Sequence, residues 1–340
     1  MIGTGGPGIR SILHPGTSLQ PIGDAGGARQ PLLFGNPEFP HFAAPPQSSA
    51  PTAKPVLRTP VPTRRPKPSS RPAPPSSATH VLVIMEENKG YKATLGSCGA
   101  DPYWCSLAAR YASDTSWYGV SHPSEPNYVA TASGGIQGCT NDTACAANSL
   151  SQTDLGGQLT ARGIPWVGWM ESMPSACSTG NGGGYVLKHN PFGFFKDNYG
   201  GTCHIRPYPG VSSALSTLDS ASAPDFVWIT PNLTHDMHDG SIQQGDAWLA
   251  ANLAPILTSS WFLNFSSTVI VTMDENDAQS SPGGGQVPMV IISSHAAGKR
   301  AVATAGNQYG LLRSIEETYR LPLLGAAANP ANGDLRSWFG

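Results

Sequence analysis

Short apolar runs bounded by turn residues recur along the chain from residue 78 onward. Five of them predict buried β-strands, at residues 80–85, 165–170, 225–230, 267–273 and 287–292. Helical patterns lie between them at residues 126–133, 245–257 and 308–319. Strands that alternate with helices predict an α/β fold in which helices cover both faces of one sheet.

The first part of the chain lacks any such pattern. Residues 1–77 carry Pro-rich stretches such as Ala44-Pro45-Pro46, with few consecutive apolar residues. A segment of this kind cannot bury enough surface to offset the entropy lost on ordering. We therefore predict a disordered extension at residues 1–77 and a single catalytic domain at residues 78–340.

Charge divides along the same boundary. Residues 1–77 hold eight Lys/Arg and two Asp/Glu, a balance of +6, and the remainder holds twelve against twenty, a balance of −8. A basic run from Arg58 to Arg71 is better interpreted as a solvated linker than as a contact for anionic surfaces. An acidic domain disfavours a nucleic-acid partner, which normally needs a basic face.

Six cysteines lie in the predicted domain, without a Cys-x-x-Cys pair or a histidine at zinc-finger spacing. Fifteen pairings are possible, and proximity along the chain favours Cys98–Cys105, Cys139–Cys145 and Cys177–Cys203. Disulfides predict an oxidising compartment, and hence a secreted protein. Residues 1–31 show no recognisable signal peptide, and no stretch reaches transmembrane length.

Acidic side chains follow two of the predicted strands directly. Glu87 and Asn88 follow the first strand, and Asp274 and Glu275 follow the fourth. Each acid alone is more simply explained as a loop residue that caps the next helix. Two such clusters at strand ends nevertheless favour a shared hard cation such as Mg²⁺ or Ca²⁺, because oxygen ligands suit these ions.

A second candidate is Ser124, within the segment from His122 to Tyr128. Pro126 places the serine near the start of a helix, so the segment taken alone is best interpreted as an ordinary helix cap. A helix N-terminus also binds phosphate, and a nearby cation would lower the pKa of the hydroxyl. Ser124 is therefore also a candidate nucleophile.

A third cluster follows the strand at residues 225–230. It contains two histidines and two aspartates within five residues: His235, Asp236, His238 and Asp239. A single loop histidine is more often structural, whereas this density favours contact with a metal or a phosphate.

Together these segments, with Gln244 to Leu249, resemble the bacterial phosphoesterase family of acid phosphatases and phospholipases C, in the alkaline phosphatase superfamily. The resemblance covers about residues 78–335 and is strongest to secreted acid phosphatases of the mycobacterial type. It implies a three-layer α/β/α sandwich and hydrolysis of phosphate monoesters, including phosphoinositides such as phosphatidylinositol 3-phosphate.

The resemblance also implies roles for individual residues. Ser124 would be the nucleophile that becomes phosphorylated beside one divalent cation. The implied metal ligands are Glu87, Asn88, Ser124, Asp274 and Glu275. The implied phosphate contacts are Asn88, His189, His235, His238 and His295, and those implied to assist catalysis are His122, His189 and His238. Histidines are cationic below their unperturbed pKa of about 6.5, which fits an acid optimum.

One residue departs from the family pattern. Many relatives carry a histidine where this chain has Gln308, which weakens the case for a second, zinc-type ion and favours Mg²⁺ or Ca²⁺ over Zn²⁺. We expect a secreted, monomeric acid phosphatase that acts on a phosphorylated small molecule or a phosphoinositide. Three alternatives remain: a phospholipase C-like phosphodiesterase, an inactive binding relative, and a sulfatase-like hydrolase. The last lacks its Cys/Ser-x-Pro-x-Arg pattern.

Overall fold

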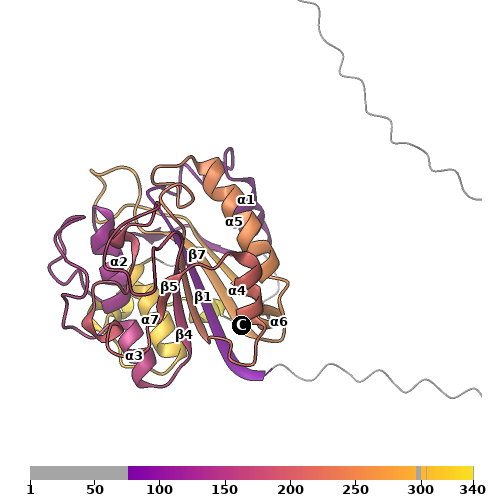
Figure 1. The fold of residues 1–340 in the computed structure, drawn as a ribbon. Coiled ribbons are helices and arrows are strands. Elements are labelled where there is room, and N and C mark those ends of the chain that lie inside the picture. Colours follow the sequence, from indigo (N-terminus) through magenta and orange to yellow (C-terminus); the bar gives the residue numbers. More distant parts are fainter. Residues whose placement is uncertain (1–75, 296–299, 304, 340) are drawn as a thin grey trace, which may run out of the picture. The chain divides into compact units, whose positions relative to one another are not determined.

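The computed structural model describes residues 76–295, 300–303 and 305–339 (Figure 1). Apart from Ser76 and Ser77, the predicted extension at residues 1–77 lies outside the described residues. The two predicted domain boundaries therefore stay predictions.

One mixed β-sheet forms the centre of the described domain. Its eight strands lie in the order β5 (Ile205–Pro207), β4 (Trp166–Met170), β6 (Phe226–Thr230), β1 (Ser76–Glu86), β7 (Phe265–Met273), β8 (Met289–Ser293), β2 (Ala112–Asp114) and β9 (Arg300–Val302). A small second sheet pairs β3 (Trp117–Tyr118) with β10 (Gly306–Asn307). The five strands predicted from the sequence are all present, and β2, β5 and β9 were missed because they are only three residues long.

Most of the main sheet is parallel. β1 pairs in parallel with β6 on one side and with β7 on the other. β8 runs antiparallel to both of its neighbours, β7 and β2. The apolar run at residues 287–292 predicted this strand but not its direction, because periodicity reports burial and says nothing about orientation.

Helices cover both faces of the sheet. They are α1 (Pro102–Arg110), α2 (Ser124–Ser133), α3 (Leu155–Ala161), α4 (Val211–Leu218), α5 (Ile242–Ile256), α6 (Ser260–Leu263) and α7 (Gln308–Thr318). Short 3₁₀ turns follow at η1 (Leu187–His189), η2 (Lys196–Asn198), η3 (Gly325–Ala328), η4 (Pro330–Asn332) and η5 (Arg336–Trp338). α2, α3 and α7 pack together on one face, and α1, α4 and α5 pack on the other (Figure 1). The predicted three-layer α/β/α sandwich is confirmed.

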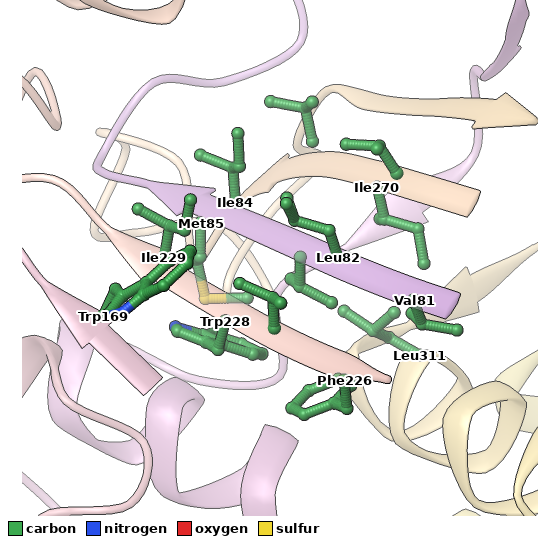
Figure 2. Close-up of a cluster of buried hydrophobic side chains, with 14 of the residues drawn as sticks. Val81, Leu82, Ile84, Met85, Trp169, Phe226, Trp228, Ile229, Ile270 and Leu311 are labelled. Atoms are coloured by element: carbon green, nitrogen blue, oxygen red, sulfur yellow. The ribbon is translucent and has the colours of Figure 1, made fainter. Parts of the chain in front are cut away.

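The central strand β1 is buried on both faces. Val81 to Met85 have no exposed surface, and they pack against Phe226 and Trp228 of β6 and Ile270 of β7 (Figure 2). Fully burying an aliphatic side chain of this kind stabilises a fold by about 1.5–3 kcal/mol. Because a one-residue slip would misplace this whole apolar set, burial fixes the register of β1 against its neighbours.

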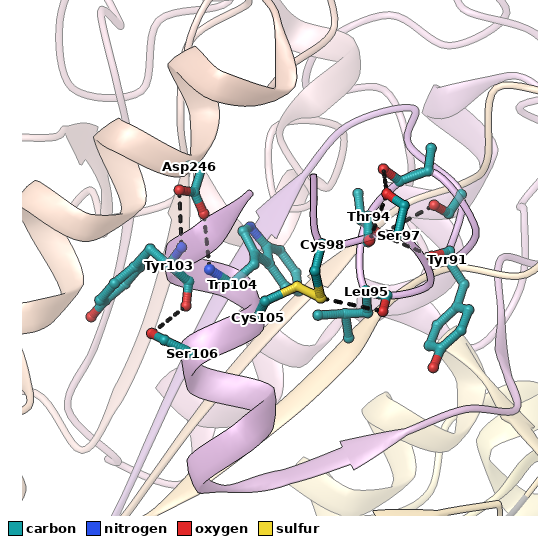
Figure 3. The surroundings of a disulfide bond; sticks show 12 residues. Tyr91, Thr94, Leu95, Ser97, Cys98, Tyr103, Trp104, Cys105, Ser106 and Asp246 are labelled. Atoms are coloured by element: carbon teal, nitrogen blue, oxygen red, sulfur yellow. Dashed lines mark hydrogen bonds between the residues drawn. A yellow bond between two sulfur atoms is a disulfide. The ribbon is translucent and has the colours of Figure 1, made fainter. Parts of the chain in front are cut away.

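Three disulfides join the described cysteines in the predicted pairs. Cys98–Cys105, Cys139–Cys145 and Cys177–Cys203 are each closed. The first lies at the start of α1, where Asp246 of α5 accepts hydrogen bonds from the backbone N–H groups of Tyr103 and Trp104 (Figure 3). Such pairing is typical of an oxidising compartment. None of the described helices is both long and apolar enough to cross a membrane.

Candidate active site

The acids predicted at the strand ends come together because of the register of β1 and β7. Glu86 lies opposite Met273 in the parallel pairing, so Glu87 and Asp274 leave the sheet at the same level. The backbone N–H of Asn88 donates to Asp274 Oδ1 at 3.1 Å. Asn88 itself has a left-handed backbone, with φ of 53°, a conformation that asparagine tolerates better than most residues. The sharp turn after β1 is thus tied to the end of β7.

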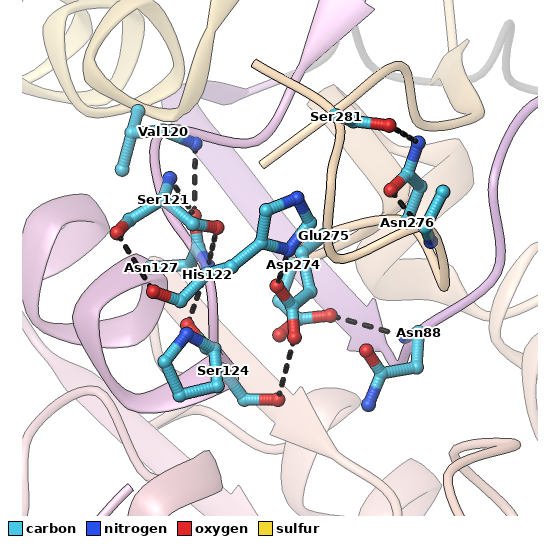
Figure 4. A network of polar contacts seen from close by, with 12 residues as sticks. Asn88, Val120, Ser121, His122, Ser124, Asn127, Asp274, Glu275, Asn276 and Ser281 are labelled. Carbon is cyan, nitrogen blue, oxygen red and sulfur yellow. Dashed lines mark hydrogen bonds and ion pairs between the residues drawn. The ribbon is translucent and has the colours of Figure 1, made fainter. Parts of the chain in front are cut away.

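Ser124 faces these acids. Its Oγ donates to Glu87 Oε2 at 2.9 Å. The same Oγ lies 3.4 Å from Glu275 Oε1 (Figure 4). α2 begins at Ser124 itself, while Pro123 is the capping residue and provides no side-chain cap. The alternative of an ordinary capping serine is therefore not what the structure contains.

The start of α2 is held by a motif asparagine. Asn127 Oδ1 accepts from the backbone N–H groups of Val120 and Ser121, at 2.8 and 3.1 Å. Its Nδ2 donates to the carbonyls of Ser121 and Pro123, at 2.8 and 3.1 Å. All four bonds are directed at the loop that precedes Ser124. We infer that Asn127 sets the position of the nucleophile candidate without contacting the acids.

The backbone N–H groups at the N-terminus of α2 differ from the prediction. The sequence predicted backbone N–H groups free for an anion at the N-terminus of α2. The N–H of Glu125 instead donates to Asp142 Oδ1 at 3.1 Å, in the loop closed by the second disulfide. A carboxylate of the chain itself therefore occupies that donor.

The acids have oxygen atoms that suit a cation. Among the described residues, Glu87 Oε1, Asn88 Oδ1 and Asp274 Oδ2 are buried without a hydrogen-bond partner. Burial, with neighbouring negative charge, raises the pKa of Asp274 to about 8 and that of Glu87 well above its usual range. Unpaired buried carboxylates are unfavourable, and a divalent cation would compensate them. The oxygen-rich set fits Mg²⁺ or Ca²⁺.

A tighter group of potential ligands lies elsewhere but does not fit a metal. Glu125, Cys139 and Cys145 bring one ligand atom each to within 4.8 Å of one another. The two sulfur atoms are joined in a disulfide, so neither can act as a thiolate ligand.

His189 joins the strand-end acids to the loop after β6. Its Nδ1 lies 3.0 Å from Asp236 Oδ2, and its Nε2 lies 3.4 Å from Glu87 Oε2. The ring of Tyr128 stacks on the imidazole with centroids 5.5 Å apart. The histidine is almost fully buried, and burial lowers its pKa well below the ordinary value. We expect a neutral His189, not the cation predicted from the sequence, while no cation is bound.

His122 contacts Glu275 directly, through Nδ1 and Oε2 (Figure 4). Burial lowers the pKa of this histidine as well. Glu275 therefore has both Ser124 and His122 as neighbours, while burial raises the pKa of its own carboxyl to about 7.

His238 is positioned by three neighbours. Its backbone N–H donates to Asp236 Oδ1 at 2.8 Å, its Nδ1 lies 2.7 Å from Asp239 Oδ1, and its Nε2 lies 3.1 Å from Lys188 Nζ. A lysine ammonium only donates, so Nε2 accepts and Nδ1 carries the proton shared with Asp239.

Lys188 is the residue that sequence reasoning overlooked. Its Nζ donates to Asp142 Oδ2 at 2.8 Å as well as to His238. Burial works against the charge, but the hydrogen bond to Asp142 and the attraction of Asp142, Glu87 and Asp274 together outweigh it and raise the pKa of the lysine. Lys188 is thus a permanent cation beside the acids. Its position directly before His189 was the only signal in the sequence.

Three other candidates lie apart from Ser124 in their contacts. His235 Nδ1 pairs with Glu171 Oε2 at 2.9 Å, and its ring stacks on Trp248. His295 is exposed, and its backbone N–H donates to Ser293 Oγ. Gln308 is buried at the start of α7, where its Nε2 donates to the carbonyl of Met273 at 2.7 Å. The roles of His235 and His295 as phosphate contacts stay predictions without a structural link to the serine.

Comparison with known proteins finds a matching family and several similar proteins. The profile of the Phosphoesterase family matches residues 98–322. A phosphatidylinositol-3-phosphatase of Mycobacterium tuberculosis is 34% identical over 74% of this chain and 80% of its own length. An acid phosphatase of Aspergillus fumigatus is 29% identical over 62% of this chain and 49% of its own length, so the chain spans about half of that fungal relative.

Solved structures agree with the fold. A protein in the alkaline phosphatase superfamily from Vibrio parahaemolyticus superposes with a TM-score of 0.55 at 12% identity, over 75% of this chain and 71% of that chain. The predicted superfamily fold is thus confirmed. The named relatives confirm the predicted enzyme class, a phosphoric monoester hydrolase. Because the family profile covers well over half of its residues, this chain belongs to the Phosphoesterase family.

Proposed function

We propose that the protein is a secreted, metal-dependent acid phosphatase that hydrolyses phosphate monoesters with Ser124 as its nucleophile. The observation that carries this proposal is the position of Ser124 Oγ, buried at the start of a helix, 2.9 Å from Glu87 and 3.4 Å from Glu275. Among the described residues, this hydroxyl has no histidine partner of the kind found in a Ser-His-Asp triad. We therefore assign activation of the serine to the acids and to the ion that they would hold.

Glu87, Asn88, Asp274 and Glu275, with the hydroxyl of Ser124, would hold one divalent cation. The buried oxygens that lack partners in the first three of these residues support this assignment. When bound, the cation would lower the pKa of the serine hydroxyl and neutralise negative charge on the phosphoryl group. We favour Mg²⁺ or Ca²⁺ over Zn²⁺, because no histidine or thiolate is needed to complete the set.

The chain's own residues would carry out two displacements. In the first, Ser124 Oγ gives up its proton to Glu87 Oε2, its present acceptor, and forms a bond to phosphorus. The bond between phosphorus and the leaving oxygen breaks, and the leaving oxygen takes that proton from Glu87 and departs as the alcohol. In the second, the oxygen of a water molecule attacks phosphorus and the bond to Ser124 breaks. One proton of the water passes to Ser124 Oγ, and the other leaves with the released hydrogen phosphate.

Positioning the phosphate would fall to the groups around the serine. Lys188 supplies a fixed positive charge, and Asn88 supplies a neutral polar group. His189 and His238, each oriented by an aspartate, line the same region. Because burial lowers the pKa of His189, we assign the attraction of a dianionic phosphate to Lys188 and the cation.

The substrate is proposed from the relatives. The mycobacterial relative is named for phosphatidylinositol 3-phosphate, and the fungal relatives are named as acid phosphatases. We propose a phosphorylated small molecule or a phosphoinositide for this chain. Relative turnover of an aryl phosphate and a choline phosphodiester would separate this activity from that of a phospholipase C-like diesterase.

The test compares wild type with Ser124→Ala in aryl phosphate hydrolysis with added Mg²⁺ or Ca²⁺. Ser106→Ala is the matched control, because its hydroxyl donates to a carbonyl on the exposed side of α1. Loss of the nucleophile should lower kcat by about a thousand-fold or more, while the control keeps wild-type rates. Rapid acid quenching should trap phosphate on wild-type Ser124. A fully active Ser124→Ala protein would exclude the proposal.

A further inference from the structure

A pocket of about 430 Å³ opens beside the candidate active site. It is lined by the first turn of α2, by the loop closed by the second disulfide, and by residues 179–181 and 186–188. The volume lies within the range of small-molecule sites, so it can hold more than water. None of the roles assigned above uses this space.

Two residues connect the pocket to the reacting groups. Glu125, which lines the pocket, directly follows Ser124 in α2. Lys188, which also lines the pocket, donates to Asp142 at 2.8 Å and to His238 at 3.1 Å. The ammonium of Lys188 thus lies at the boundary between the pocket and the acids. A substrate whose phosphate reaches Ser124 has this pocket next to it.

The polar groups of the pocket indicate what it would accept. Glu125 and Asp142 offer carboxyl acceptors, and Asn181 and Lys188 offer donors. An alcohol that carries several hydroxyl groups can donate to the carboxylates and accept from the ammonium. A bare hydrocarbon or aromatic group can make none of these additional hydrogen bonds, so the pocket would favour a polyol over it.

We propose that this pocket is the subsite for the alcohol half of the phosphate ester and that it selects polyol phosphates, with Lys188 as a specificity-determining residue. The inference rests on the proposed function, because it presupposes phosphate transfer at Ser124. The subsite is assigned to one of two pockets beside the candidate active site. The other, of about 500 Å³ around Tyr91, Lys92 and Asn276, has no hydrogen bond among the described residues that links it to the active-site histidines.

The first test closes the pocket by size. Gly180 lines it, has an ordinary backbone conformation, and a Cβ added there would meet no atom within 4 Å. Gly180→Phe should therefore fold and fill the pocket. Gly200→Phe is the matched control, since its Cβ also meets nothing and it lies outside the pocket. We expect Gly180→Phe to lower kcat/KM for inositol monophosphate by about ten-fold more than for methyl phosphate, which has almost no alcohol group to place.

The second test changes the chemistry of the pocket without its size. Lys188→Ala should lower kcat/KM for both substrates, because each loses the attraction of its phosphate to the ammonium. It should in addition reduce the preference for inositol monophosphate over phenyl phosphate by about ten-fold, because only the polyol also loses a charge-assisted hydrogen bond from its alcohol half. Lys92→Ala removes the same side chain from the rival hollow and should leave the preference at the wild-type value. Thermal unfolding of every variant establishes that it is folded.

The outcomes separate the two proposals. If wild type hydrolyses phenyl phosphate and Ser124→Ala does not, the proposed function holds whatever the pocket variants do. An unchanged substrate preference in Gly180→Phe and Lys188→Ala, or an equal change in Gly200→Phe or Lys92→Ala, overturns the subsite. Loss of polyol preference confined to the first pair supports it.

Discussion

Replacing Asp274 by Asn separates cation binding from folding, because the two should respond in opposite directions. The carboxyl is fully buried, and its Oδ2 has no hydrogen-bond partner, while Oδ1 accepts from the backbone of Asn88. Asparagine has nearly the same shape and keeps an Oδ1 acceptor for that N–H group. The change therefore removes a cation ligand without removing the hydrogen bond.

The magnitude for wild type follows from mass action. A ligand that binds only the folded state, at a hundred times its dissociation constant, stabilises by about 2.7 kcal/mol. For a domain of this size each kcal/mol raises Tm by about 2–4 °C, so Mg²⁺ or Ca²⁺ should raise it by about 5–10 °C. Asp274→Asn should lose most of this increase.

Without a bound cation, the order of the Tm values of wild type and Asp274→Asn should be reversed. Burial raises the pKa of Asp274 to about 8, so its ionised form is disfavoured in the folded protein. In acid the carboxyl is protonated and stabilises the folded protein, and this contribution is lost as pH rises through the folded pKa of about 8. Without cation, Asp274→Asn should therefore unfold at or above the wild-type Tm near neutral pH.

The assay is thermal unfolding after EDTA treatment, followed by separate titration with Mg²⁺, Ca²⁺ and Zn²⁺. Asp277→Asn is the matched control, because Asp277 is an exposed acid three positions along the same loop. It should respond to the cation as wild type does. An equal cation response in Asp274→Asn, or none in wild type with any of the three ions, would refute the predicted site.

Three further predictions concern the rest of the domain. Burial raises the pKa of Glu316 to about 8, so the stability that its protonated carboxyl contributes is complete below the pKa of the unfolded state and declines as pH rises toward about 8. Glu316→Gln should therefore make the free energy of unfolding in urea less dependent on pH over that range, where each pK unit is worth about 1.4 kcal/mol. Removing the disulfide of Cys177 and Cys203, which are 26 positions apart, should reduce the free energy of unfolding by about 3 kcal/mol, measured by denaturant titration. Gly245→Ala should lower both Tm and kcat, although alanine usually favours helices, because its Cβ would lie 2.4 Å from Met237 Cγ in the loop that carries His238.

The residue pattern was sufficient for much of the fold. Continuous apolar runs such as residues 80–85 and 225–230 predicted strands buried on both faces, and β1 and β6 occupy them. The disulfide pairs also followed from spacing, because cysteines close along the chain are easily brought together. Polar residues at the ends of parallel strands predicted the acidic cluster, since such ends meet at one edge of a sheet.

Other features depended on contacts between distant segments. The direction of β8, the pairing of His235 with Glu171, and the position of Lys188 between Asp142 and His238 have no local signature. The lowered pKa values of His189 and His122 likewise reflect burial and neighbours that only the folded chain provides.

The sequence by itself therefore determined which segments are buried and which chemical groups stand at strand ends, because periodicity and turn residues act over a few positions. Only the tertiary structure decided that Ser124 starts its helix and turns its hydroxyl to Glu87, 37 positions away. Such distances are set by how the layers pack and by the register of the sheet, and both are properties of the whole chain.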